Sequence, residues 1–294
     1  MPNQLQPLVD EINTCAAFQD PELKQQAVDF INLLVNPNQV VLQRNLRLVD
    51  DLTPDQEACL VTALRRALKL NNNTVKGNAA EALRNLPDVA GSAVPDLVGL
   101  LDPATEAGVR LRAAVAVAEI GPADADCLPQ LITHLTDPDP DIQKPVIVAI
   151  SKLGSEAAAA FEPLKAIFPA DDEAVNEALI SAFGELGRRA APIAPNLAHY
   201  LQPGNSNPIR RATARSLEQL GIIPDEAIPH LVAGLQPEEE YDLRTAFLGA
   251  LQQSTLASDQ FVAQLAPFAD DESLGPDIIK LLVRINSQAG VAVL

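Results

Sequence analysis

Apolar residues recur along this chain with a period of 33 or 34 residues. Each recurrence opens a stretch in which apolar residues return every three or four positions, which is the spacing of an amphipathic helix. A fixed period of this length is typical of proteins built from repeated supersecondary units. The pattern therefore predicts one helix, called helix A, at the start of each of about six repeats. The aligned residues are Val75, Val109, Ile142, Val175, Ile209 and Leu243.

Two further signals hold fixed places within the repeats. Glycine follows an apolar residue where helix A should end, because glycine adopts positive φ without steric penalty. Proline stands several residues later, where its missing N–H costs nothing in the first turn of a helix. These signals predict a second helix, helix B, in each repeat. The glycines are Gly121, Gly154, Gly187 and Gly221, and the prolines are Pro95, Pro129, Pro195 and Pro229.

Both helices of a repeat carry one apolar stripe. Helix B has it at Leu128, Leu131 and Leu135, and helix A shows it at Val109 and at the equivalent positions of other repeats. A pair of helices this short cannot bury both stripes alone, so neighbouring repeats must stack into a continuous core. The predicted fold class is all-α, an α-solenoid of stacked antiparallel helix pairs.

The ends of the chain depart from the repeat. Residues 1–72 carry helix-start signals at Asp20-Pro21 and at Thr53-Pro54, and we interpret them as two degenerate helical repeats. The polar run at 71–73 indicates a loop rather than a linker. Residues 73–270 hold the repeats, and 271–294 supply a capping helix followed by a frayed or docked tail. We therefore expect one elongated domain over 1–294.

The repeat resembles the HEAT-repeat family. It is most similar to the short phycobilisome-lyase-type repeat, in which V-R-x-x-A-x-x-A-L-x-x-L-G is followed by A-x-P-x-L-x-x-L-L-x-D. VRLRAAVAVAEIG (109–121) and IRRATARSLEQLG (209–221) follow the first part of this pattern. The resemblance implies stacking in which helix B lines the concave face.

Composition narrows the functions. The chain has 21 Lys and Arg against 39 Asp and Glu, a net charge of −18, which disfavours binding to nucleic acid. No apolar run has the length of a membrane span, and the first residues do not look like a signal peptide, so we expect a cytoplasmic protein without membrane contact. Cys15, Cys59 and Cys127 show no paired spacing, and we expect unpaired thiols in a reducing compartment.

No known catalytic motif is present in the sequence. It has no phosphate-binding glycine loop, no GxSxG elbow and no HExxH, and its three histidines fall in different repeats. We therefore expect no enzyme activity, no bound cofactor and no metal site.

Acidic clusters occupy the turns between helix B of one repeat and helix A of the next. Stacking would align them along one edge of the solenoid, called the acidic rim. They could cap helices and pair with Arg110, Arg210 and Arg244, or they could steer a basic partner. The rim residues are Asp137, Asp139, Asp141, Asp171, Asp172, Glu173, Glu238, Glu239 and Glu240.

A second set of polar residues lies on helix B, outside its apolar stripe. It contains all three histidines, and amides, imidazoles and phenols suit adaptable hydrogen bonding to a protein partner. They could equally be ordinary solvated residues. The candidates are Gln130, Thr133, His134, Asn196, His199, Tyr200 and His230.

Three functions remain open. The leading one is a non-enzymatic scaffold that binds another protein, with a basic protein as one candidate, through the concave face and the acidic rim. The resemblance implies a second: a bilin lyase subunit or chaperone-like factor whose partner is a phycobiliprotein, although 3% aromatic residues and no Trp offer little to hold a tetrapyrrole. The third is a helper in iron–sulfur or metal assembly, with Cys127 as its exposed ligand.

Overall fold

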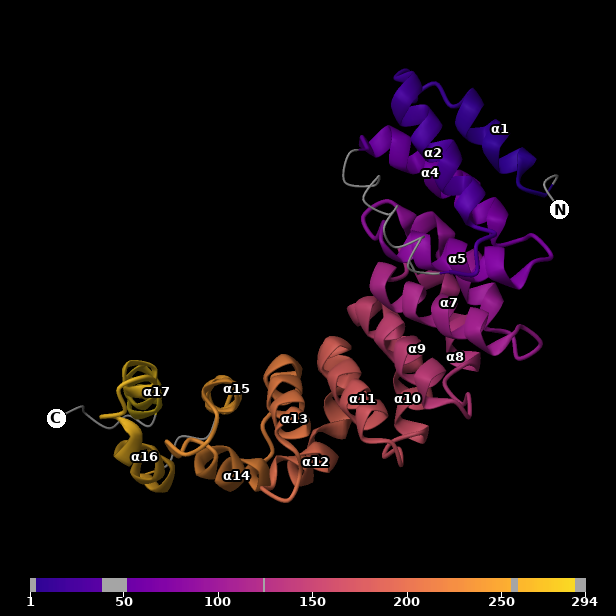
Figure 1. The fold of residues 1–294 in the computed structure, drawn as a ribbon. Helices are drawn as coiled ribbons and strands as arrows, with labels where there is room; N and C mark the ends of the chain where they lie inside the picture. The colour runs from indigo at the N-terminus through magenta and orange to yellow at the C-terminus, as the bar shows by residue number, and fades with distance from the viewer. Residues whose placement is uncertain (1–3, 39–51, 124, 255–258, 289–294) are drawn as a thin grey trace. The chain divides into compact units, whose positions relative to one another are not determined.

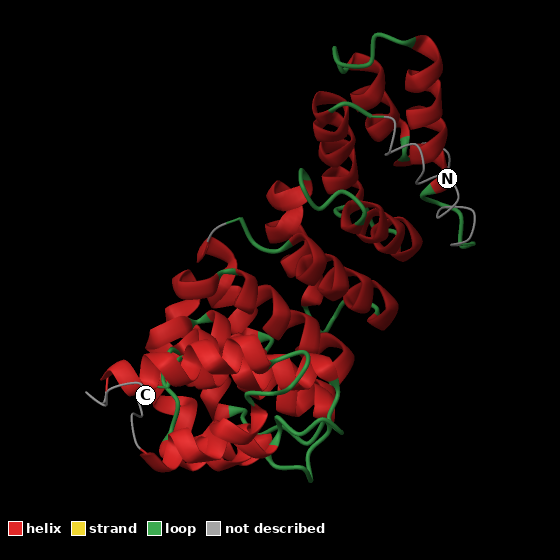
Figure 2. Ribbon diagram, turned by 90° about the vertical axis from the view of Figure 1, so that its left-hand side faces the viewer, coloured by secondary structure: helices red, strands yellow, loops and turns green. Residues whose placement is uncertain are grey.

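The structure is a computed structural model that describes residues 4–38, 52–123, 125–254 and 259–288. Throughout these ranges the chain forms helices joined by loops, and no strand occurs in them (Figure 2). Contacts within the chain group it into two compact units, Met1–Leu153 and Gly154–Leu294. The all-α prediction is confirmed.

The first unit contains the N-terminal helices and the first repeats (Figure 1). Its α-helices are α1 (Gln6–Thr14), α2 (Pro21–Leu33), α4 (Pro54–Ala67), α5 (Asn73–Arg84), α6 (Val94–Val98), α7 (Ala107–Ile120), α8 (Leu128–Thr133) and α9 (Pro140–Lys152). Its 3₁₀ helices are η3 (Ala90–Ala93), η4 (Gly99–Leu101) and η5 (Ala125–Cys127).

The second unit continues the same alternation. In Figure 1, α11, α13, α15 and α17 form one row of helices, and α12, α14 and α16 form the other row. Its α-helices are α10 (Phe161–Ala166), α11 (Glu173–Glu185), α12 (Ala194–Leu197), α13 (Asn207–Leu220), α14 (Ile228–Ala233), α15 (Tyr241–Gln252), α16 (Asp259–Leu265) and α17 (Gly275–Gln288). Its 3₁₀ helices are η6 (Gly154–Ala160), η7 (Gly187–Ile193), η8 (Ala198–Leu201), η9 (Asp225–Ala227) and η10 (Ala266–Phe268).

The predicted helices A are confirmed as α5, α7, α9, α11, α13 and α15, each beginning two residues before its aligned apolar residue. Helix B begins where the sequence places it, but it differs in form. The α-helical part of α8 is only six residues long and that of α12 only four, with 3₁₀ turns beside them. Proline near the start of each helix contributes to the short α-helical part. It has no N–H to donate, so the α-helical hydrogen bonding cannot extend toward the preceding residues.

The glycine signals are confirmed. Gly121, Gly154, Gly187 and Gly221 all have positive φ, between 53° and 77°. At Gly221 the backbone N–H donates to the carbonyl oxygens of Leu217 and Glu218, both at 3.1 Å, and this closes α13. A side chain would be strained in this conformation, so glycine allows the chain to turn sharply from helix A to helix B.

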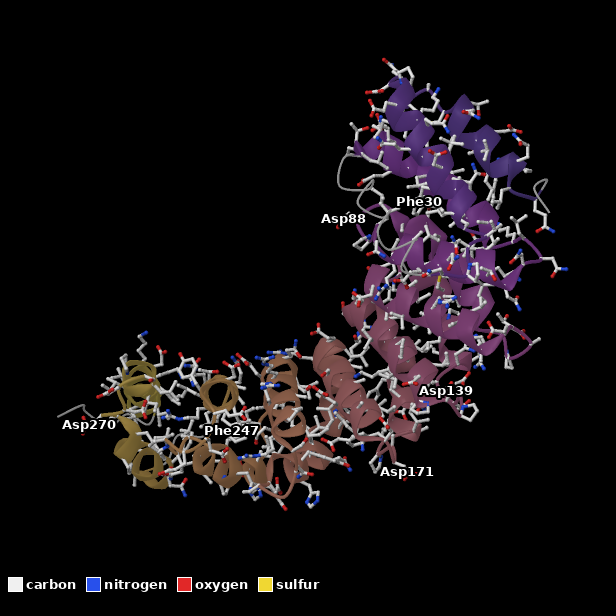
Figure 3. All side chains as sticks on the ribbon, viewed as in Figure 1. Phe30, Asp88, Asp139, Asp171, Phe247 and Asp270 are labelled. Atoms are coloured by element: carbon white, nitrogen blue, oxygen red, sulfur yellow. A yellow bond between two sulfur atoms is a disulfide. The ribbon has the colours of Figure 1, made fainter. Side chains whose placement is uncertain are left out.

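The apolar stripes form the core. Val109, Leu131, Leu217 and Leu231 are fully buried, and Ile120 is the exception because it remains half-exposed at the end of α7. Phe30 in the first unit and Phe247 in the second are among the largest buried side chains (Figure 3). Phe18, Phe183 and Phe261 are buried as well, and most other core side chains are aliphatic.

The end segments follow most of their sequence signals. Asp20 caps α2 by accepting the N–H of Glu22 at 2.8 Å, and the N–H of Thr53 donates to Oε1 of Gln56 at 2.9 Å at the start of α4. The loop expected at 71–73 is shorter than predicted, because Asn72 caps α5 and the helix already begins at Asn73. The predicted C-terminal helix is α17, and the tail after Gln288 lies outside the described residues.

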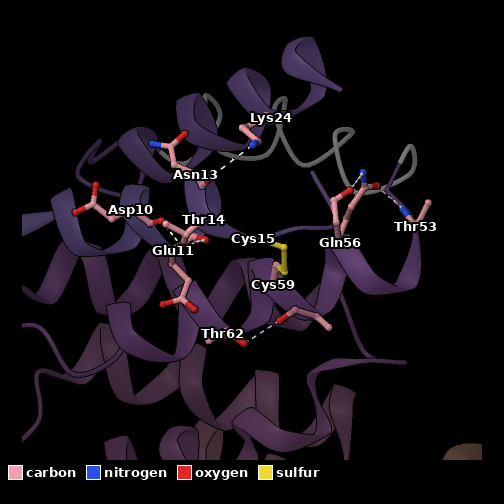
Figure 4. Close-up of a disulfide and its surroundings, with 12 residues drawn as sticks. Asp10, Glu11, Asn13, Thr14, Cys15, Lys24, Thr53, Gln56, Cys59 and Thr62 are labelled. Carbon is pink, nitrogen blue, oxygen red and sulfur yellow. Dashed lines mark hydrogen bonds between the residues drawn. A yellow bond between two sulfur atoms is a disulfide. The ribbon is translucent and has the colours of Figure 1, made fainter. Parts of the chain in front are cut away.

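The expectation of unpaired Cys15 and Cys59 is wrong. The two residues form a disulfide, 44 residues apart in sequence with their Cα atoms 6.4 Å apart, which joins the end of α1 to α4 (Figure 4). Both are half-exposed rather than buried among apolar side chains. Sequence spacing could not reveal the pair, because α1 and α4 become neighbours only when the N-terminal helices pack. The inference of a reducing compartment from unpaired thiols therefore loses its basis.

One position of helix A connects the repeats through hydrogen bonds. It directly follows the aligned apolar residue, and in five repeats its side chain donates to a backbone carbonyl near the end of the preceding helix B. Four of those carbonyls lie at the end of helix B or in the turn directly after it, where the helix itself offers no partner, and the fifth, that of Ala170, lies in the loop after α10. The bonds are Arg110 Nε to Leu101 at 3.2 Å, Gln143 Nε2 to Leu135 at 2.6 Å, Asn176 Nδ2 to Ala170 at 2.6 Å, Arg210 Nε to Leu201 at 3.3 Å and Arg244 Nε to Leu235 at 3.0 Å.

Where this residue is arginine, it also pairs with a carboxylate in the loop after the next helix B. Arg210 binds both oxygens of Glu239 at 2.7 and 3.0 Å, and its side chain is only 5% exposed. Arg110 pairs with Asp137 and Arg244 with Asp271 in the same way. We call these arginines and their carbonyl and carboxylate partners the arginine ladder. The acidic turns thus supply carboxylates to these three arginines, whose side chains are 5–14% exposed.

Replacing Arg210 with lysine should lower the free energy of unfolding by about 2–3 kcal/mol, because one ammonium cannot reach the Leu201 carbonyl and both Glu239 oxygens. Arg215→Lys, at an exposed position of α13 without a partner among the described residues, is the matched control and should change it by less than about 0.5 kcal/mol. Denaturant unfolding followed by circular dichroism measures both. Equal stability of R210K and the unmodified protein would contradict a stabilising ladder.

Alkylation of protein purified without reductant should leave Cys15 and Cys59 unmodified even after unfolding, because a disulfide has no thiol to react. Cys127 is 8% exposed and should react only after unfolding. Mass spectrometry of the peptides identifies each site. Reduction should also lower stability by as much as about 4 kcal/mol, through the lost chain constraint. Modification of all three cysteines without reductant would disprove the pairing.

Candidate partner-binding surface

The predicted helix-B residues fall on both units. In the first unit Gln130 and Thr133 are exposed and His134 is half-exposed. All three lie at α8, whose last turn is tied by the bond from Thr133 Oγ1 to the carbonyl of Gln130 at 2.7 Å. In the second unit the candidates Asn196, His199, Tyr200 and His230 lie at α12, η8 and α14.

The surroundings of His134 shift the pKa of its imidazole. Its pKa lies below the usual 6.5, mainly because burial disfavours the charged imidazolium, and the nearby Arg110 acts in the same direction. The carboxylates of Asp137 and Asp102 oppose the shift. The ring is therefore neutral near pH 7 and can both donate and accept a hydrogen bond.

In the second unit, aromatic rings gather around two of the candidates. The ring of Tyr200 lies 5.3 Å from that of Phe168 and 5.9 Å from that of His199, measured between ring centroids. Phe168 in turn makes an edge contact with buried Phe183 at 5.4 Å. We call Phe168, His199 and Tyr200 the aromatic cluster. It runs from the core to the surface, since Phe168 and Tyr200 are half-exposed and His199 is exposed.

Sequence reasoning found His199 and Tyr200 but missed Phe168. The available signal was an aromatic residue just after helix B in a chain with only eight Phe and two Tyr. Burial against the neighbouring rings raises the pKa of the Tyr200 phenol above its usual 10.0. The phenol therefore stays protonated at neutral pH and can donate a hydrogen bond from an apolar setting.

The acidic rim residues divide into two groups. Asp139 and Asp172 cap α9 and α11, Asp137 and Glu239 belong to the arginine ladder, and Glu173 accepts a hydrogen bond from Ser206. The remaining four, Asp141, Asp171, Glu238 and Glu240, take no such part and are exposed, as are Asp139, Asp172 and Glu173. The rim is thus partly structural, and the four residues without such a role are all exposed on it.

The cysteine proposed as an exposed metal ligand does not fit that role. Cys127 ends η5 and is only 8% exposed, so the expectation of an accessible thiol is wrong. Its burial follows from its place directly before Leu128, the first stripe residue of α8. Within the described ranges, no three or more His, Cys, Asp and Glu side chains are arranged to hold a metal ion.

A membrane-spanning helix is absent from the part of the chain that the structure describes, because none of its helices combines sufficient length with sufficient apolar character.

Two protein-family models match parts of the sequence. A model of HEAT repeats matches residues 94–161, and a model of the PBS lyase HEAT-like repeat matches residues 209–237. No curated protein matches the sequence.

Solved structures show similar folds. The crystal structure of an engineered protein, determined by the Northeast Structural Genomics Consortium, has a TM-score of 0.63 and 21% sequence identity, covering 97% of this chain and 85% of that one. The structure of the complex of CpcE and CpcF of phycocyanin lyase from Nostoc sp. PCC7120 has a TM-score of 0.48 and 19% identity, covering 80% of this chain and 95% of that one. The helix pairs and the first of these structures show an all-α solenoid fold, within which residues 94–161 match HEAT repeats and residues 209–237 match the PBS lyase HEAT-like repeat.

Proposed function

We propose that the chain is a non-enzymatic scaffold that binds a partner protein through the exposed residues of helix B and the exposed rim carboxylates. The observation that carries this proposal is the aromatic cluster. Aromatic side chains with one apolar end and one polar end are enriched at protein interfaces and frequently dominate their binding energy. In a chain that is only 3% aromatic, grouping of such rings at the surface is informative.

Other helix-B residues have chemistry that suits the same task. Asn196 is exposed and His230 half-exposed in the second unit, and Gln130 and Thr133 are exposed in the first. Amide, hydroxyl and imidazole groups both donate and accept hydrogen bonds, so they adapt to a partner's backbone and polar side chains. Asn196 and His230 would add polar contacts to those of the aromatic cluster in their own unit, and Gln130 and Thr133 would offer polar contacts on the first unit.

Charge favours a basic partner. Seven of the nine rim residues are exposed, and the chain carries a net charge of −18. Complementary potentials accelerate association and exclude wrongly charged partners more than they add affinity. The proposal thus assigns encounter to the carboxylates and affinity to the aromatic cluster.

The double variant His199→Ala/Tyr200→Ala should weaken binding to the partner by at least about tenfold, because truncating interface anchors typically costs more than 1 kcal/mol each. The partner is first captured from the source lysate, and calorimetric titration of the purified proteins then gives Kd. Ser181→Ala/Arg215→Ala, at exposed positions of helices A in the same unit, is the matched control and should leave Kd unchanged. An unchanged Kd for the His199/Tyr200 variant would remove the aromatic cluster from the interface.

A second candidate function is supported by one observation, the match of residues 209–237 to the PBS lyase HEAT-like repeat. In that case the chain would be a bilin lyase subunit or a chaperone-like factor, and its partner would be a phycobiliprotein. The scaffold proposal expects no change in the visible spectrum when free bilin is added to the purified chain. A shifted or intensified band, abolished by unfolding the protein, would favour the second function.

A further inference from the structure

A groove of about 590 Å³ lies between the helices B of the last two repeats, entirely within the second unit. One wall comes from α14 and the loop after it, and the other from α16, η10 and the loop that leads to α17. Its volume is within the range of roughly 300–1,000 Å³ that is usual for ligand pockets. None of its lining residues was among the candidates identified from the sequence.

The groove is lined mainly by apolar residues. Pro229, Pro237 and Pro267 line it with exposed rings, while Val232 and Phe268 are 9% and 8% exposed. Rigid proline rings lose no rotamer freedom on binding, so burying them against a ligand carries a small entropic cost. This lining favours an apolar side chain as the ligand group that enters.

Glycine allows one wall of the groove to pack directly on the core. Gly234 follows Ala233, which lines the groove, and Gly234 itself is buried. A β-carbon at Gly234 would overlap the ring of Phe247, so close packing of this segment against α15 requires glycine there. The α14 wall of the groove is therefore held against helix A of the next repeat.

The polar residues that line the groove are amides and carboxylates. Its lining includes the amides of Gln236 and Gln264 and the carboxylates of Asp270 and Asp271, and it includes no basic residue. Asp271 is occupied by Arg244, and hydrogen bonds from the Leu274 backbone and from Arg244 hold its pKa below the usual 3.8. Asp270 is exposed and makes no ion pair among the described residues, so its charge is available to a ligand (Figure 3).

We propose that this groove binds a segment of the partner protein in which an apolar side chain is flanked by lysine or arginine. The apolar side chain enters between the prolines, and the basic side chains pair with Asp270 and the exposed carboxylates of Glu238 and Glu240 in the adjoining loop. This inference rests on the proposed scaffold function and gives its partner a sequence chemistry. A second copy of the chain fits poorly, because each copy carries a net charge of −18.

The test uses the purified full chain and four fluorescein-labelled peptides of equal length in a Gly-Ser frame. One alternates lysine with leucine, and the others replace leucine with serine, lysine with glutamate, or lysine with serine. We expect the lysine-leucine peptide to bind at least about tenfold more tightly than the other three in fluorescence anisotropy. If the lysine-serine peptide bound as tightly as the lysine-leucine peptide, charge alone would account for the binding and the proposal would be overturned. The absence of measurable binding by any of the four peptides would also overturn it.

Matched variants locate the binding. Ala233→Trp fills the groove and Asp270→Lys reverses its free charge, so each should weaken the lysine-leucine peptide at least about fivefold. Ala166→Trp and Glu162→Lys change exposed residues on α10, helix B of an earlier repeat in the same unit, and should have no such effect. Equal loss in the control pair would place the peptide elsewhere and overturn the proposal.

Binding of the whole partner separates the groove from the scaffold function. A233W could lose the peptide and still bind the partner with unchanged Kd, while the His199/Tyr200 variant binds the partner more weakly. That result would reject the groove as the partner's site and leave the scaffold function intact.

Discussion

A buried hydrogen-bonding side chain at the start of helix A is the constraint on which the repeat depends. The last carbonyls of a short helix B have no partner within that helix, and burying them unsatisfied would cost about 1–3 kcal/mol each. Arg210 satisfies one such carbonyl and uses its remaining donors for the carboxylate of Glu239 one loop later. Because the guanidinium is 5% exposed, neither partner can be removed without leaving a buried charge. The ladder therefore fixes the distance between successive turns.

The ladder also determines which acidic residues remain for function. An acidic loop residue that pairs with an arginine of the ladder or caps a helix has a role in the fold, as Asp137 and Asp172 do. Its neighbours in the same loop are exposed and have no such role, as at Asp171 and Glu238. A net charge of −18 thus overstates the charge available to a partner. Within each unit, the proposed partner-binding surface is the part of the helix-B face and rim that the ladder does not use.

Local signals made most of the fold predictable. The period, the glycine at the end of helix A and the proline at the start of helix B each act through the backbone of a few neighbouring residues, so they can be read without knowing the tertiary structure. The disulfide of Cys15 with Cys59, the cluster around Phe168 and the groove beside Pro229 join residues from different helices. Stacking creates these features, and a single sequence contains no periodic signal for them. His199 and Tyr200 were identified because they also obey the local register of helix B.

The ladder and the core packing also position one wall of the groove in the second unit. The guanidinium of Arg210 lies 5.3 Å from the ring centroid of Phe247, so the ladder contacts this core ring. The same ring abuts Gly234 closely enough to exclude any β-carbon. The end of α14 therefore packs directly on α15, and Val232 and Ala233 of α14 line the groove. A packing demand in the core thus determines where one wall of the proposed peptide-binding groove lies.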